Sequence, residues 1–273
     1  MSESAWIHPS WKAQHPKASH PLQILLDEAY LFPPIYEEFE DVSQSTHCFP
    51  SPDSQHTTRL CKLLEKAHAV QINIDSWYNG LQKQYNRDWN QDNAMAEPQI
   101  HQTTFPQWDN KDADPSEHHL GKAFSVAYTF ADFSIATSYI FYEAIQICID
   151  EFIHDMNGKM ARLNTNPRSN GLAGQDEVGM QFSSNEHPRE HPLYERISSR
   201  ASRICQSAEY FFRPDNKIIG PMIFLFPLAV ATRTFSKLCI RHESVSSQET
   251  RKLKWCHMIE ARLRAVGLSP YDL

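Results

Sequence analysis

The sequence predicts an all-α fold, in which about six to eight helices form a single domain around a long central helix. Apolar residues recur at steps of three or four in several segments, as they do on the buried face of a helix. Glycine is scarce, with 8 among 273 residues, and 41% of the residues are hydrophobic against 22% charged. Those proportions are ordinary for a soluble globular protein, and a chain of this length can bury a sizeable core.

The N-terminal region is predicted to contain one short helix. Residues 1–18 are expected to form an irregular arm. Pro21 can occupy the first turn of an amphipathic helix that runs to Tyr30, and we expect the two prolines at 33–34 to end it. Residues 41–56 are rich in Ser, Pro and His and are predicted to form a loop.

The next helix is defined by apolar periodicity between residues 60 and 81. Its apolar positions are Leu60, Leu63, Leu64, Ala67, Val70, Ile74, Trp77 and Leu81. Charged residues take the opposite face, which is typical of a helix packed on a core. Residues 86–116 are polar and contain prolines, so we predict a long loop there.

The central helix is expected within the segment from Ser116 to Asn157, which only Gly121 interrupts. A serine N-cap and an Asn-Gly stop at residues 157–158 frame this segment. A straight helix of that span would be about 60 Å long. A compact globule of this size is only about 48 Å across. We therefore expect the helix to bend or to begin later than Ser116.

Polar side chains share one face of this central segment when it is plotted at about 100° per residue. They are Ser125, Tyr128, Thr129, Asp132, Tyr139, Glu143, Gln146 and Asp150. Most of the other residues are apolar, so we predict a buried helix. Buried carboxylates must be paired or lose their charge, and a guanidinium group pairs with them through parallel hydrogen bonds. The alternatives are a solvated face, or internal pairs with Arg233 or Lys237.

Residues 159–187 are predicted to form a mobile insert between the two helical halves of the domain. They are rich in Asn, Gly and Ser and offer little apolar surface to bury. The segment is interpreted as part of one domain, not as a linker between two.

Three helices are predicted after this insert. The first covers residues 193–212. The second starts at Pro221, and Pro227 either kinks it or resets its start. The third opens on the capping box at residues 246–249 and ends at Gly267.

Charge is distributed unevenly along the chain, whose net charge is −7. Residues 189–273 are basic while the preceding residues are acidic, so the last third could offer a surface for a phosphate backbone. The residues proposed for tRNA binding are Arg196, Arg200, Arg203, Arg213, Lys217, Arg251, Lys252 and Lys254. The alternative is that these residues pair with acidic residues of the same domain.

Several classes of protein are not indicated. The start of the chain does not resemble a signal peptide, and acidic residues interrupt the longest apolar region, so we expect a cytoplasmic protein with no membrane partner. The six cysteines are scattered, which indicates reduced and mostly buried thiols. Neither a metal-ligand pattern nor a nucleotide-binding motif occurs, so no metal and no cofactor is expected. The oligomeric state stays open.

Residues 199–263 contain motifs that resemble those of a known protein family. The segment Ile204-Cys-x-Ser-x-Glu209-Tyr-Phe-Phe is followed by Gly220-Pro-x-x-x-Leu-Phe-Pro and then by Lys254-Trp-Cys. This order resembles the helical regulatory half of fungal zinc-cluster transcription factors. The six-cysteine DNA-binding module of those proteins is missing here, so no DNA partner is expected. The chain also resembles the fungal arginine-containing cyclodipeptide synthases, which are stand-alone proteins similar to the same domain.

The second resemblance implies an enzyme of fungal secondary metabolism. Such an enzyme joins arginine and a second amino acid, each delivered on tRNA, into a cyclic dipeptide. Under this interpretation the candidate substrate-binding residues are Asp132, Glu143, Gln146 and Glu209, and the candidate catalytic residues are Tyr128 and Tyr139. Glu209 has the alternative of a salt bridge with Arg203 or Arg213. A covalent route would need a nucleophile, and no Ser, Thr or Cys is marked by a neighbouring base.

The rival interpretation is a non-enzymatic regulator that binds a protein partner or a metabolite. It predicts a nuclear protein with no turnover. Because Met1 opens a chain that lacks the zinc cluster, the sequence favours the enzyme.

Overall fold

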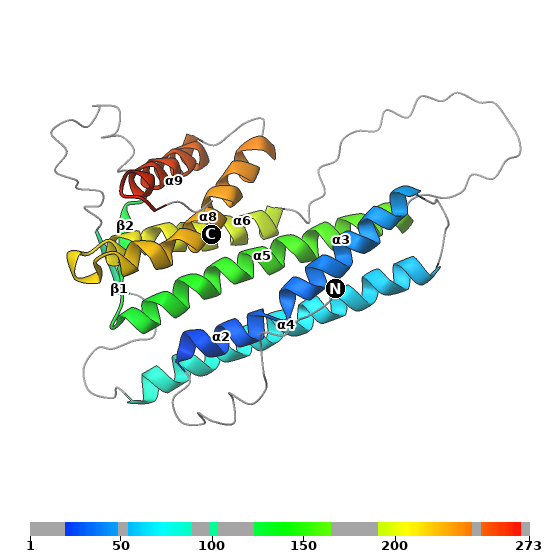
Figure 1. Cartoon of the computed structure of the whole chain (residues 1–273), viewed down its shortest axis with the longest axis horizontal. Helices are drawn as coiled ribbons and strands as arrows, with labels where there is room; N and C mark the ends of the chain where they lie inside the picture. The colour runs from blue at the N-terminus through cyan, green and yellow to red at the C-terminus, as the bar shows by residue number, and fades with distance from the viewer. Residues whose placement is uncertain are drawn as a thin grey trace, which may run out of the picture.

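The computed structural model describes residues 20–48, 54–88, 99–102, 123–164, 191–241 and 247–268, and these are mostly helical (Figure 1). The helices are α2 (Pro21–Ala29), α3 (Phe32–Cys48), α4 (Ser54–Asp88), α5 (Phe133–Asn164), α6 (His191–Gln206), α7 (Ala208–Phe211), α8 (Ile219–Arg241) and α9 (Ser247–Ala265). Two short strands, β1 (Gln99–Gln102) and β2 (Val126–Thr129), pair antiparallel. The predicted all-α fold is confirmed, with this two-stranded sheet as an addition that periodicity did not indicate.

Helix α5 runs through the middle of the fold (Figure 1). It packs on α2 and α4 on one side and on α6 and α8 on the other, while α3 packs on α4 and α9 on α8. Its residues therefore enter two cores. Ile149 and Met156 are buried in the N-terminal core with α2, α3 and α4. Ile140 and Ile147 are buried in the C-terminal core with α6 to α9. A helix covered from two sides is apolar nearly all round, which explains its sequence.

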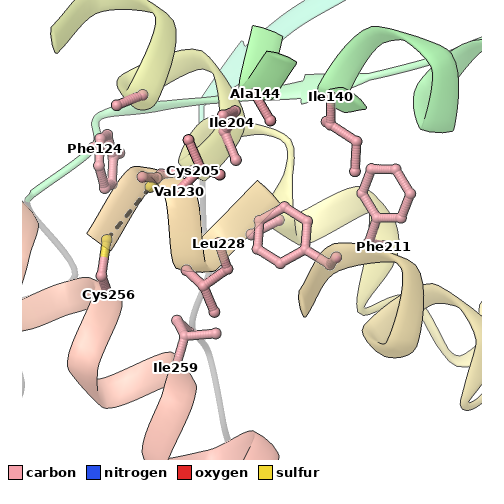
Figure 2. Packing of buried hydrophobic residues seen from close by; sticks show 14 of the residues in the cluster. Phe124, Ile140, Ala144, Ile204, Cys205, Phe211, Leu228, Val230, Cys256 and Ile259 are labelled. Carbon is pink, nitrogen blue, oxygen red and sulfur yellow. Dashed lines mark hydrogen bonds between the residues drawn. The ribbon is translucent and has the colours of Figure 1, made fainter. Parts of the chain in front are cut away.

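The C-terminal core holds two thiols side by side. Figure 2 shows Cys205 of α6 facing Cys256 of α9, with the two sulfur atoms 3.6 Å apart. Both residues are buried, whereas Cys61 is exposed. The described cysteines are all free, as predicted, but they are not mostly buried.

Helix α5 begins and ends later than its capping signals indicate. It starts at Phe133, so the alternative of a start after Ser116 is confirmed. The predicted end at residues 157–158 is wrong, because the helix continues to Asn164. A glycine inside a helix costs about 1 kcal/mol. Here that cost is offset, since Met156 is buried and Met160 packs on the N-terminal core, one on each side of Gly158.

The polar face predicted for the central segment is shorter than expected. Tyr128 and Thr129 lie on β2, and Asp132 precedes α5, where its Oδ1 accepts a hydrogen bond from the Ile135 amide at 2.8 Å. Asp132 is thus the N-cap of the helix. On α5 itself the polar face consists of Tyr139, Glu143, Gln146 and Asp150.

In the N-terminal region two predicted boundaries are wrong. The prolines at 33–34 lie in the first turn of α3, where proline is well tolerated, so they begin a helix instead of ending one. Residues 41–48 continue that helix, although a loop was predicted there. Residues 54–88 form α4, which extends the predicted helix at both ends, and β1 lies within the predicted long loop. The predicted arm at residues 1–18 lies outside the described residues.

The C-terminal helices follow the prediction more closely. Ser207 divides the predicted 193–212 helix into α6 and α7. Pro227 lies inside α8 and does not reset its start. Gly267 has φ +81° and the Leu268 amide donates to the Leu263 carbonyl at 2.9 Å, which is the predicted glycine stop.

Two predicted features fall partly beyond the described chain. Of the predicted insert at 159–187, residues 159–164 belong to α5 and the remainder lies outside the described residues. The serine of the capping box, Ser246, also lies outside them, and α9 begins at the next residue.

Among the described helices, α8 is long and apolar enough to cross a membrane, over Ile219–Ile240. However, 56% of its most apolar window is buried inside the fold. That burial is typical of a core helix, because α8 packs against α5, α6 and α9.

Candidate functional site

A buried network of charges joins α5 to α6. The carboxylate of Glu143 accepts hydrogen bonds from Arg200 Nη1 at 2.8 Å, Arg203 Nε at 2.7 Å and Arg203 Nη2 at 3.1 Å. The Glu143 side chain is 4% exposed and that of Arg200 13%. The Arg203 contact is bidentate, which is a strong geometry for an arginine–carboxylate pair.

The second carboxylate of this network is Asp150, two turns further along α5. Arg196 Nε and Nη2 donate to its two oxygen atoms at 3.0 and 2.9 Å. Gln71 of α4 donates to Oδ1 at 2.8 Å. Arg200 Nε lies 3.7 Å from Oδ2, which makes Arg200 a link between both carboxylates. The two acids are thus paired within the chain.

Electrostatics in the network favour the charged forms of Arg200 and Arg203. Burial alone lowers the pKa of Arg200, but the charge of Glu143 and the hydrogen bond to it raise the pKa more, so it lies above its ordinary value. Burial also lowers the pKa of Arg203, but the hydrogen bond to Glu143 and the charge of Glu143 raise it above its ordinary value. A buried charge is tolerated only when it is paired in this way.

The spacing of the arginines explains how the sequence builds this network. Positions 196, 200 and 203 are separated by four and three residues, so they share one face of α6. Glu143 and Asp150 are seven residues apart and share one face of α5. The alternative that basic residues pair with acidic residues of the same domain is confirmed for these three arginines.

The other residues predicted to bind tRNA lie apart from this network. Lys252 is only 8% exposed, where its ammonium group contacts Glu249 at 3.0 Å, so it does not belong to a basic surface. Arg213 is exposed and donates to the Thr129 hydroxyl at 2.6 Å. Outside this network, the exposed basic side chains of the predicted set are Arg213, Lys217, Arg251 and Lys254.

The predicted catalytic tyrosines, Tyr128 and Tyr139, pack among other aromatic rings. Tyr139 is buried against Tyr78, Tyr128 and Phe130. Burial and then the charge of Glu143 raise the pKa of Tyr139 far above its ordinary value. Burial also raises the pKa of Tyr128. Both hydroxyl groups therefore hold their protons firmly near neutral pH.

Of the predicted substrate-binding residues, Glu143 and Gln146 share the polar face of α5, whereas Asp132 and Glu209 lie elsewhere. Asp132 caps α5. Glu209 lies 3.2 Å from His101 of β1. The residues predicted to pair with the central acids, Arg233 and Lys237, instead contact Glu151 at 3.1 and 2.8 Å.

A cavity of about 440 Å³ lies between α4, α5 and α6, beside the charged network. Its lining residues are His68, Gln71, Asp75, Asp150, Ile153, His154, Asn157, Leu193, Arg196 and Arg200. We call it the network pocket. Its volume is within the range that small-molecule sites occupy.

Asp75 of α4 is an acidic group of the network pocket that no cation of the described residues neutralises. Its Oδ1 accepts hydrogen bonds from the Tyr142 hydroxyl and from Gln146 Nε2, both at 2.8 Å. Among the described residues no Lys, Arg or His side chain forms an ion pair with this carboxylate, and none donates to Oδ2. A second cavity, of about 530 Å³ along α4, also includes Asp75 in its lining.

Sequence reasoning missed Asp75 and found its partner Gln146. The available signal was the pair Gln71 and Asp75, which lie four residues apart beside the apolar face of α4. Such a pair normally faces water, so only the packing of α4 on α5 identifies it. For metal binding, the described chain contains no group of three or more His, Cys, Asp or Glu side chains that could hold an ion.

Comparison with known proteins gives no family: no family model, no curated protein and no solved structure matches this chain.

Proposed function

We propose that this chain is an aminoacyl-tRNA-dependent cyclodipeptide synthase, and that its network pocket binds the guanidinium group of an arginyl substrate. The observation that supports the binding part is Asp75, a pocket carboxylate without a cationic partner among the described residues. The reaction class is supported by the resemblance within residues 199–263. The substrates would be arginyl-tRNA and a second aminoacyl-tRNA, and the product a cyclic Arg-Xaa dipeptide made in the cytoplasm.

Asp75 suits a guanidinium group for geometric reasons. Tyr142 and Gln146 both hold Oδ1, so the carboxylate is oriented before a ligand arrives. Oδ2 is left to accept an N–H group, and a guanidinium offers parallel donors to a carboxylate. An ion pair formed inside a partly enclosed pocket is screened less than one at the surface.

The substrate role that the sequence suggested for Glu143 moves to Asp75 in this proposal. Glu143 already holds two guanidinium groups of the chain, and Asp150 holds another. A ligand would have to displace one of them, and breaking a buried ion pair costs about 3–5 kcal/mol. Asp75 needs no such displacement.

Arg196 connects the pocket with the proposed tRNA. Its side chain is 54% exposed although its guanidinium contacts Asp150 at the pocket. An exposed cation beside the aminoacyl group is suited to a phosphate of the acceptor end. The exposed side chains of Arg213, Lys217, Arg251 and Lys254 are proposed as further phosphate contacts.

The test is a product assay. The protein is incubated with arginyl-tRNA and, one at a time, with each other aminoacyl-tRNA, and cyclo(Arg-Xaa) is sought by mass spectrometry. We expect a product with at least one partner, and its loss in Asp75→Asn. The control Glu151→Gln changes an acid of α5 that does not line the network pocket and is paired with Arg233 and Lys237, and it should keep the product.

Absence of product from the wild-type protein with all twenty amino acids would contradict the proposed reaction. If such an inactive protein bound a nuclear protein partner, the regulator interpretation would replace it.

A further inference from the structure

His154 occupies a distinct position in the network pocket. It follows Asp150 by one turn on α5 and lines the same cavity. Its Nε2 lies 3.0 Å from the hydroxyl of Tyr194 on α6, and the two rings meet edge to face at 5.6 Å. The imidazole is thus held by a neighbouring helix, while among the described residues nothing forms a hydrogen bond with its Nδ1.

The other lining groups are poorly suited to accept a proton. The carboxylate of Asp150 is occupied by Arg196 and Gln71, and Asp75 is assigned to the guanidinium group. Arginine side chains only donate. His68 is an imidazole too, but it lies exposed on α4. Imidazole is the side chain that most readily takes up and releases a proton near neutral pH.

We propose that His154 is the proton acceptor of the reaction, with Tyr194 as the residue that positions it. In this arrangement Nε2–H donates to the Tyr194 oxygen, and the lone pair on Nδ1 receives the proton of the attacking amine. The inference rests on the proposed function, because it supplies the base that aminolysis of two aminoacyl esters needs.

The step balances without a cofactor. The α-amine nitrogen of one aminoacyl group forms a bond to the ester carbonyl carbon of the other, and the bond from that carbon to the ribose oxygen breaks. The proton leaves the amine for Nδ1 of His154 and passes to the departing ribose oxygen, so the imidazole returns to its neutral form. A second, intramolecular aminolysis closes the ring in the same way.

Charged and titratable groups surround His154 from four helices. They are His68 and Asp75 of α4, Asp150, Glu151 and Asp155 of α5, Tyr194, Arg196 and Arg200 of α6, and Lys237 of α8. The pH dependence of the rate of product formation is therefore assigned to His154 only if substitution of His154 abolishes that dependence.

The experiment compares His154→Gln with His68→Gln in the product assay between about pH 5 and 8, where imidazoles titrate. Glutamine can keep the contact with Tyr194 but cannot take up the proton. We expect His154→Gln to lower the rate of product formation about 10²- to 10⁴-fold, which is the usual contribution of a general base. The rise of the rate with pH should disappear, and the affinity for arginine methyl ester should stay the same.

The positioning role has its own variant. Tyr194→Phe keeps the ring but removes the hydroxyl, so the rate should fall while its rise with pH remains. If His154→Gln fails to fold, product formation by His154→Ala is measured with and without added imidazole. Restored product formation supports the inference, and no restoration in a folded protein contradicts it.

The two proposals fail in different ways. A His154→Gln protein with the wild-type rate and pH profile would overturn the role of His154 and leave the synthase intact. A wild-type protein without product would overturn the synthase itself.

Discussion

Replacing Glu143 with glutamine tests whether the buried network holds α6 on α5. The carboxylate is 4% exposed and accepts three hydrogen bonds from Arg200 and Arg203. Glutamine keeps the shape of the side chain, but it removes the negative charge. It also replaces one of the two accepting oxygens with an NH2 group, which can only donate to the guanidinium side. Two cations would then remain near each other with no carboxylate between them.

The expected loss follows from the burial of the partners. Removing one member of a buried ion pair costs about 3–5 kcal/mol. Arg200 is 13% exposed and Arg203 31%, so Arg203 regains part of its hydration in the variant. We therefore expect the lower end, about 3 kcal/mol, which lowers the melting temperature of a domain of this size by roughly 6–12 °C.

Urea unfolding followed by circular dichroism measures this loss as a lower midpoint at an unchanged slope. The matched control is Glu151→Gln on the same helix, whose partners Arg233 and Lys237 are about half exposed. Pairs with exposed partners contribute about 0–1 kcal/mol. If both variants lose the same small amount, the network does not hold the two helices together.

Three other features of the fold give measurable expectations. A methyl group at Gly220 would overlap the carbonyl oxygen of Phe211, so Gly220→Ala should lower the free energy of unfolding by about 1–3 kcal/mol in a urea titration. Asp132→Ala should lower it by about 1 kcal/mol, because the N-cap of α5 is lost. Burial, and then the charge of Glu143, raise the pKa of Tyr139. The unfolded tyrosine releases its proton first, so stability should be retained below about pH 10 and fall above it in urea titrations over pH.

Each of these expectations has a control. Gly80 has open space around it, so Gly80→Ala should not destabilise, and equal effects at the two glycines would contradict the close packing of α8 on α7. Asp132→Ser keeps a capping oxygen and should retain most of the stability; a loss as large as that of the alanine variant would argue against capping. Tyr139→Phe should make the alkaline decline shallower, and an unchanged decline would assign it to other groups.

Periodicity predicted the helices better than their ends. The apolar spacing of residues 60–81 identified α4, and the apolar composition of the central segment identified α5 as buried. The predicted helix ends were wrong where the sequence contains a helix-breaking residue that the folded structure accommodates. Gly158 stays helical because Met156 is buried in the N-terminal core and Met160 packs against it, and the prolines at 33–34 are compatible with the first turn of α3.

The site was predictable only in part. The buried carboxylates on α5 and the need for guanidinium partners followed from the sequence, and both Glu143 and Asp150 have such partners. The source of the guanidinium groups did not follow, because it depends on α6 lying antiparallel along α5. Asp75 was missed since its environment is created by α4 packing on Tyr142 and Gln146, which are far from it in sequence.

Titration calorimetry with two esters of the same shape tests the central claim most directly. Arginine methyl ester carries a guanidinium group and citrulline methyl ester a neutral urea in its place. We predict that the wild-type protein and Glu151→Gln bind the arginine ester, that Asp75→Asn does not, and that none of them binds the citrulline ester. Equal affinity for both esters, or undiminished arginine binding by Asp75→Asn, would contradict the assignment of Asp75.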